Sequence, residues 1–114
     1  MASECRNGLP DHGAFGTMLL RHRSLERLEA SLCRDTATRL DQWQVQVLLQ
    51  VLHRGRVLLR SELEEDSVRQ CGLIPIKDIE ASLAEHLCSL GPEPHVAVLP
   101  EGPQTIPYVT DDSA

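Results

Sequence analysis

The side chains best suited to chemistry in this sequence are its four cysteines and five histidines. The cysteines contain no CxxC pair, so the spacing indicates neither a zinc site nor a redox pair. Cys5 and His12 share a glycine-containing loop, but two ligands at an undistinctive spacing are a weak metal signal. The chain also lacks a GxSxG motif and a cysteine placed beside a paired histidine, which speaks against an autonomous hydrolase. We therefore assign no catalytic residue and no metal ligand from these residues.

Three residues are candidates for lining a pocket. Trp43 falls on the border between the polar and apolar faces of a helix expected over residues 42–54, a position compatible with lining a pocket, although a tryptophan there is more often a core aromatic. Gln44 falls inside the apolar arc of that helix, where an amide needs partners from backbone, a neighbouring segment or a ligand. His12 follows an inferred strand end, where α/β sheets place ligands, although loop histidines are more often exposed or capping residues.

The remaining cysteines are interpreted as structural. Cys33, Cys71 and Cys88 lie among or beside apolar residues in expected helices, so we predict that they are small buried hydrophobes. No secretion signal precedes them, which disfavours a disulfide framework and makes the cytoplasm the expected location.

Composition excludes two classes of partner. The formal net charge is −6, and the basic residues near the N-terminus alternate with acidic ones, as on a solvated helix face. With only three aromatic residues as well, we expect no nucleic-acid partner. No apolar stretch approaches the roughly 20 residues of a membrane span, so no membrane partner is expected.

The elements that must position these residues begin with three helices. The first is expected near residue 14 with Asp11 as its cap, and the second is expected after Ser24, with Leu25, Leu28 and Leu32 as one buried stripe. The third runs from residue 42 to 54 between Asp41 and a closing C′ glycine, Gly55. Its polar face carries Gln42, Gln46, Gln50 and His53, while the valines and leucines between them form the apolar arc.

Two strands and two further helices complete the expected chain. The run RVLLR (56–60) suits a buried parallel strand, and Ser61 with Glu64 suits a capping box for the next helix. After Pro75, Asp78 is expected to cap a final helix whose apolar face is Ile79, Leu83, Leu87 and Leu90. HVAVL (95–99) is expected to be the second strand.

The predicted fold class is α/β, a small helix-rich parallel βαβ layer that is incomplete without upstream strands. A third parallel strand ending just before Cys5 would complete it. The length suits one domain, which we place at residues 1–110, followed by a polar tail at 111–114.

Three motifs in this order resemble the C-terminal end of the nickel-dependent lactate racemase family. They are DQWQVQ (41–46), GLxP (72–75) and VLPxGP (98–103) followed by a threonine, and CRNGLPDHGAFG (5–16) resembles a loop of the same domain. The resemblance covers nearly all of this chain, but about a quarter of a family member. It implies that the chain is the C-terminal part of a 2-hydroxyacid racemase or epimerase.

The resemblance also implies which residues of a family member carry out the chemistry and in which half they lie. Family members use a nickel-pincer nucleotide attached to a lysine as hydride acceptor, with histidines as general acid and base. Those residues lie in the family's N-terminal half, which no segment here resembles, so we expect that this chain alone does not bind the cofactor. Trp43 matches the family's tryptophan beside substrate and cofactor, whereas Lys77 lies in the wrong motif to match the family's substrate lysine.

Two readings of the function follow. In the first, the chain supplies one wall of the substrate and cofactor site, is inactive alone, and needs the N-terminal catalytic half, either in the same protein or as a separate chain. In the second, it is a stand-alone, non-catalytic interaction domain, a homodimer that associates through an open sheet edge.

Overall fold

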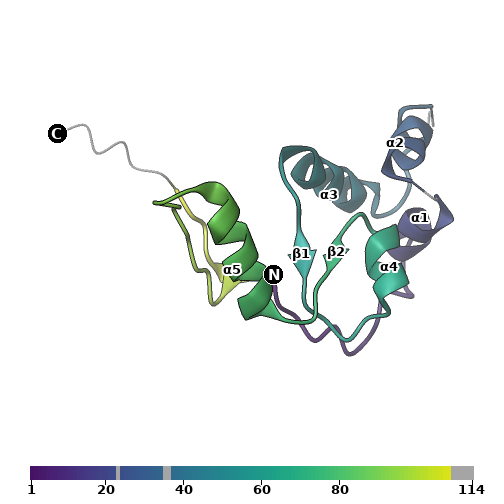
Figure 1. Ribbon diagram of the computed structural model, residues 1–114. Coiled ribbons are helices and arrows are strands. Elements are labelled where there is room, and N and C mark those ends of the chain that lie inside the picture. Colours follow the sequence, from purple (N-terminus) through teal and green to yellow (C-terminus); the bar gives the residue numbers. More distant parts are fainter. Residues whose placement is uncertain (23, 35–36, 109–114) are drawn as a thin grey trace.

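The computed structural model describes residues 1–22, 24–34 and 37–108 of the chain. Its elements, in order, are α1 (Phe15–Arg21), α2 (Leu25–Arg34), α3 (Gln42–Arg54), β1 (Leu58–Leu59), α4 (Glu65–Gln70), β2 (Ile74–Pro75), α5 (Ile79–Leu90) and the 3-10 turn η1 (Gly102–Gln104) (Figure 1). The tail predicted at 111–114 lies outside the described residues. Among those residues, none of the helices has the length and apolar character needed to cross a membrane.

A small parallel layer confirms the predicted α/β class. Leu58 of β1 lies opposite Ile74 of β2, and α4 joins the two strands as a crossover. On the other side of β1, Ala2 forms a parallel bridge with Arg60, and the Ser3 amide donates to the Arg60 carbonyl at 3.0 Å. The N-terminal residues therefore lie where the expected third strand ends, just before Cys5.

The position predicted for the second strand was wrong. The strand beside β1 is β2 rather than residues 95–99, because the Ile74 amide donates to the Val57 carbonyl at 2.9 Å and occupies that place. The connection through α4 is short, so residue 74 reaches β1 at a small cost in loop entropy. Pro75 then closes the outer edge, since proline offers no N–H to a further strand. Within the described part of the chain, residues 95–99 are irregular and make no backbone hydrogen bond.

The hydrophobic core lies between α1, α2 and α3. Its buried members are Met18, Leu19, Leu28, Val45, Leu49 and Cys71, with Leu25 and Leu32 packed against them, as the leucine stripe predicts. Gly72 follows with a φ of +77°, and a Cβ there would lie 2.7 Å from Leu25. This position therefore requires glycine.

Two of the predicted helix caps are confirmed and two are wrong. The Ser24 hydroxyl accepts from the Arg27 amide at 3.3 Å, and the Asp78 carboxylate accepts from the Ala81 amide at 2.9 Å. Asp11 caps nothing, because the Ala14 amide donates to Asp41 instead. The capping box also fails: α4 begins at Glu65 without a side-chain cap, since the Glu62 amide donates to the Glu4 carbonyl and extends the layer.

The ends of α3 are confirmed, but the conformations of the flanking residues differ from expectation. Asp41 precedes α3 with φ 63°, in the left-handed region, and it makes no side-chain cap on its own helix. Gly55 ends the helix in an extended conformation, with φ −173°, rather than in the left-handed conformation of a C′ glycine. The chain therefore leaves α3 directly into the extended approach to β1.

The cysteine prediction holds for one residue and fails for two. Cys71 is buried in the core, whereas Cys33 and Cys88 are exposed. Burial also raises the pKa of the Cys71 thiol.

We expect native thiol labelling to separate these cysteines. Cys33 and Cys88 should react with a maleimide or iodoacetamide about tenfold or more faster than Cys71, which must wait for local opening and carries less thiolate. Peptide mapping by mass spectrometry after timed quenching measures the three rates. Equal labelling of Cys71 and Cys33 would contradict the core described above.

Candidate functional site

A largely apolar groove lies where α3 passes over the start of the two strands. It encloses about 390 Å³ and is lined by residues from the N-terminus, α1, α3 and the entries to β1 and β2. The lining residues are Met1, Phe15, Trp43, Gln44, Val47, Leu48, Val51, Val57 and Leu73.

The helical repeat of α3 explains why this groove is apolar. Val45 and Leu49 face the core, and Trp43, Val47 and Val51 form a separate row, each four residues from the next, on the opposite side of the helix. This row is uncovered: the exposed fraction of Trp43 is 64% and that of Val47 is 51%. Val47 and Val51 belong to the expected apolar arc, but their side chains stay exposed because the core against α1 and α2 occupies only the Val45 side.

Asp41 positions Phe15, which lines the groove together with this row. Its carboxylate accepts a hydrogen bond from the Ala14 amide at 3.0 Å, across 27 residues of sequence. Phe15 follows Ala14 directly and lines the groove, so this bond ties the start of α1 to the start of α3. The sequence indicates only that an aspartate precedes a helix, which predicts a local cap and not this long-range contact.

The structure brings two of the three candidate residues together. Trp43 and Gln44 both line the groove, Trp43 as its exposed aromatic and the half-buried Gln44 as its one polar side chain. His12 does not line it. Its ring is fully accessible to solvent and lies 3.6 Å from the Asp11 carboxylate.

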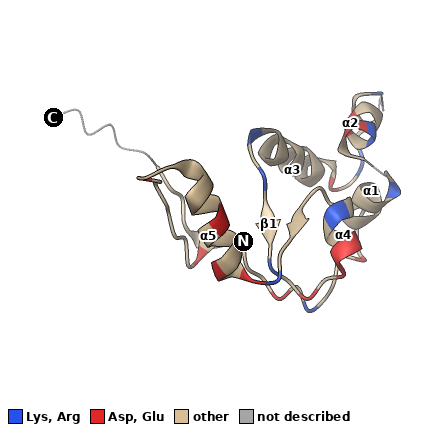
Figure 2. Ribbon diagram, viewed as in Figure 1, with Lys and Arg blue, Asp and Glu red and all other residues tan. Residues whose placement is uncertain are grey.

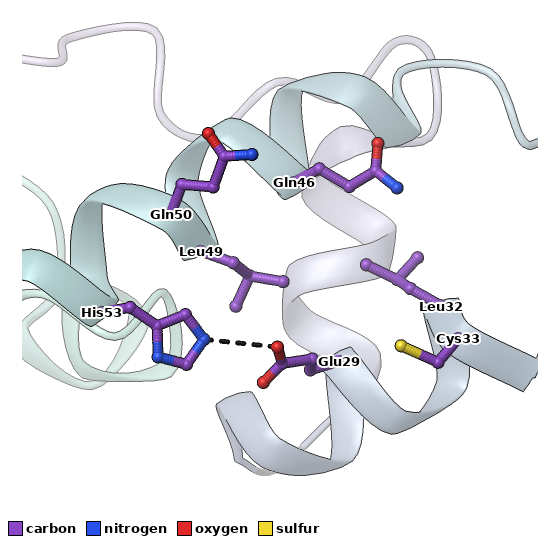
Figure 3. Close-up of a pocket in the computed structure, with 7 residues that line it drawn as sticks. All are labelled: Glu29, Leu32, Cys33, Gln46, Leu49, Gln50 and His53. Atoms are coloured by element: carbon purple, nitrogen blue, oxygen red, sulfur yellow. Dashed lines mark hydrogen bonds and ion pairs between the residues drawn. The ribbon is translucent and has the colours of Figure 1, made fainter.

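A second hollow, of about 440 Å³, lies between α2 and α3. Figure 3 shows the His53 ring facing the Glu29 carboxylate across this gap, with Nε2 and Oε1 3.3 Å apart. Its other lining residues are Leu32, Cys33, Gln46, Leu49 and Gln50. The sequence predicted that Gln46, Gln50 and His53 share one face of α3. It did not predict that Glu29 of α2 lies opposite them, because no local pattern indicates that contact. Both partners of the pair are well exposed, so solvent screening leaves the contact weak.

The described residues do not bring three metal-binding side chains together. In the part that the structure describes, no three His, Cys, Asp or Glu side chains lie close enough together to hold a metal ion. The groove itself offers one amide and no charged side chain to a ligand. We therefore derive no step of nickel chemistry from these residues.

Comparison with known proteins gives one family. A family model described as the lactate racemase C-terminal domain matches residues 1–106. No curated protein and no solved structure matches the chain.

Proposed function

This chain belongs to the lactate racemase C-terminal domain family, and from that membership we propose that it supplies one wall of the substrate and cofactor site of a 2-hydroxyacid racemase or epimerase. The rest of that site, including the catalytic half, comes from outside the segment described above. In this proposal the isolated chain is inactive.

The observation that carries the proposal is the placement of Trp43. It stands in the DQWQ motif by which the sequence resembles the family. Its aromatic side chain is exposed and lines a largely apolar groove. A tryptophan serving only the core would be buried. Here Val45 and Leu49 fill that role, and Trp43 faces outward.

The chemistry of the groove suits a wall and not a catalytic centre. An apolar surface excludes water from a reacting centre and strengthens electrostatic interactions within it. Gln44 can both donate to and accept from a polar group of a ligand, and the Trp43 indole N–H can donate. A bound nickel-pincer nucleotide would supply the hydride acceptor, which no side chain in this chain provides.

A racemisation assay tests this proposal. Full-length protein, purified from cells that make the cofactor, is incubated with single enantiomers of lactate and of larger 2-hydroxyacids, and both enantiomers are then quantified by chiral chromatography. We expect racemisation or epimerisation by the full-length protein and none by the 114-residue chain. A cofactor-loaded full-length protein that interconverts none of these acids would overturn the assignment.

The alternative function is that of a stand-alone interaction domain, and an open sheet edge favours it. The Met1 carbonyl and the Ser3 amide both bond to Arg60 at 3.0 Å, so the N–H and C=O of Ala2 between them point away from β1. Such an edge can pair with another chain. This function predicts a stable 114-residue protein in cells, with no requirement for a catalytic half.

A further inference from the structure

Helix α5 carries an apolar row that the described residues leave largely uncovered, with only Leu87 half-buried. Ile79, Leu83 and Leu87 follow one another at intervals of four residues, and Leu90 continues the same face. No residue of α5 is buried, and the exposed fraction of Leu83 is 46%. Figure 1 shows α5 on one side of the two strands and helices α1, α2 and α4 on the other. A helix of 12 residues is marginal in water without packing, so this row calls for a partner.

The groove beside α3 matches this row in spacing. Trp43, Val47 and Val51 are also separated by four residues each, and all three are exposed. Two ridges of residues four apart interlock in the commonest mode of helix packing. Tryptophan at the end of such a row is the residue type most often found to dominate an interface.

The charges at the helix ends favour one orientation of α5 against α3. Arg54 and Arg56 lie exposed where α3 ends, and Asp78 and Glu80 lie exposed where α5 begins. Figure 2 shows the basic end of α3 and the acidic residues of α5. Within the described residues, Arg54 and Arg56 form no ion pair. An antiparallel arrangement would therefore place opposite charges together and set Ile79 near Val51 and Leu83 near Val47.

The connection between β2 and α5 holds the helix away from its own groove. The Ile76 amide donates to the Leu59 carbonyl at 3.0 Å, and Lys77 Nζ lies 3.3 Å from Glu65 of α4. Leu73 lines the groove, but the chain then runs along β1 and leaves the sheet at its other end. For α5 to reverse into its own groove, these contacts would have to break, whereas a second copy can reach it without change.

We propose that two copies of this chain form a dimer in which α5 of each copy packs against the Trp43–Val47–Val51 row of the other. The exchange is reciprocal, so one two-fold axis covers both apolar rows at once. The same groove cannot then serve as a substrate wall. The dimer is therefore the form taken by the chain without its catalytic half. This proposal does not depend on the proposed function.

Trp43 is the only tryptophan of the chain and reports directly on the groove. Sedimentation velocity and tryptophan emission are measured over a dilution series that starts at low micromolar concentration. We expect a monomer–dimer transition accompanied by a blue shift of emission at the same midpoint. Monomer at every concentration would overturn the proposal, as would a blue shift that does not depend on concentration, which would mean that α5 covers its own groove.

Matched variants identify the surface. Leu83→Glu should weaken dimerisation by about tenfold or more, whereas Ala81→Glu, which adds the same charge to the opposite face of α5, should change it by about twofold or less. Equal effects of the two would place the interface elsewhere. Circular dichroism checks that each variant keeps its helices.

A charge-swap test keeps the proposal falsifiable even if Leu83→Glu alone fails to fold. Val47→Lys, at an exposed position of α3, should by itself weaken the dimer about tenfold or more. In the double variant Val47→Lys with Leu83→Glu, the introduced lysine of one copy faces the introduced glutamate of the other, so most of the lost association should return. A double variant that dimerises no better than either single variant would contradict the predicted pairing. The racemisation assay of the full-length protein is unaffected by either result.

Discussion

Replacing Trp43 by alanine in the full-length protein is expected to lower kcat/KM for 2-hydroxyacid racemisation by about a hundredfold. The change removes the aromatic wall of the groove, so the substrate and cofactor lose a surface that positions them and excludes water. Stopped-time assays with chiral chromatography measure the effect. Because the side chain is 64% exposed, the free energy of unfolding should change by only about 1 kcal/mol or less.

Tyr108→Ala is the matched control for this experiment. Tyr108 is also a strongly exposed aromatic residue, and it does not line the groove. Its removal should leave kcat/KM unchanged. If both variants behave like the wild type, Trp43 has no part in the site, and the wall assigned to this chain is wrong.

A second large effect is expected in the core. Val45→Asp should destabilise the chain by about 4 kcal/mol or more, because Val45 has no exposed surface and a carboxylate there would be buried without a partner. That loss is comparable with the whole stability of a small domain, about 5 to 15 kcal/mol. Chemical denaturation followed by circular dichroism should show a protein that is largely unfolded before denaturant is added.

Val47→Asp gives the matched comparison on the same helix. The substitution is identical and lies two residues further along, but Val47 is 51% exposed and belongs to the uncovered row. We expect a change in unfolding free energy of about 0.5 kcal/mol. Measured at concentrations below the monomer–dimer midpoint, similar losses for the two variants would mean that the Trp43 face of α3 is packed within the monomer and that no open groove exists.

The sequence predicted α3 to the residue because several local signals agree there. A flanking aspartate, a flanking glycine and a row of glutamines all bound the same segment. The same kind of local signal located the caps at Ser24 and Asp78.

The errors arose where position depends on contacts between distant residues. HVAVL has the composition of a strand, but β2 occupies the place beside β1 and Pro75 closes the next edge. Ser61 and Glu64 fit a capping box, but the Glu62 amide donates to the Glu4 carbonyl, and residues 61–63 form bends instead of a helical turn. In both cases a backbone hydrogen bond to a remote segment outweighed a local preference.

The groove was predictable only for its α3 residues, Trp43 and Gln44. The helical repeat places Trp43 on the border of the apolar face, and the structure puts it beside the groove. Phe15, Val57 and Leu73 share that groove because Asp41 holds α1 in place and because β1 and β2 begin there. No local pattern encodes such contacts, so they become visible only once the fold is known.

The central claim is that this chain acts as one domain of a racemase, and the intact mass of the protein in its native cells tests it most directly. An antibody against the 114-residue chain would isolate the protein for mass spectrometry. We predict a species several times heavier than 12.7 kDa, since the catalytic half is expected in the same protein as this domain. A species of 12.7 kDa with no larger chain bound to it would contradict the claim, because the cell would then make this domain without the residues that carry the chemistry.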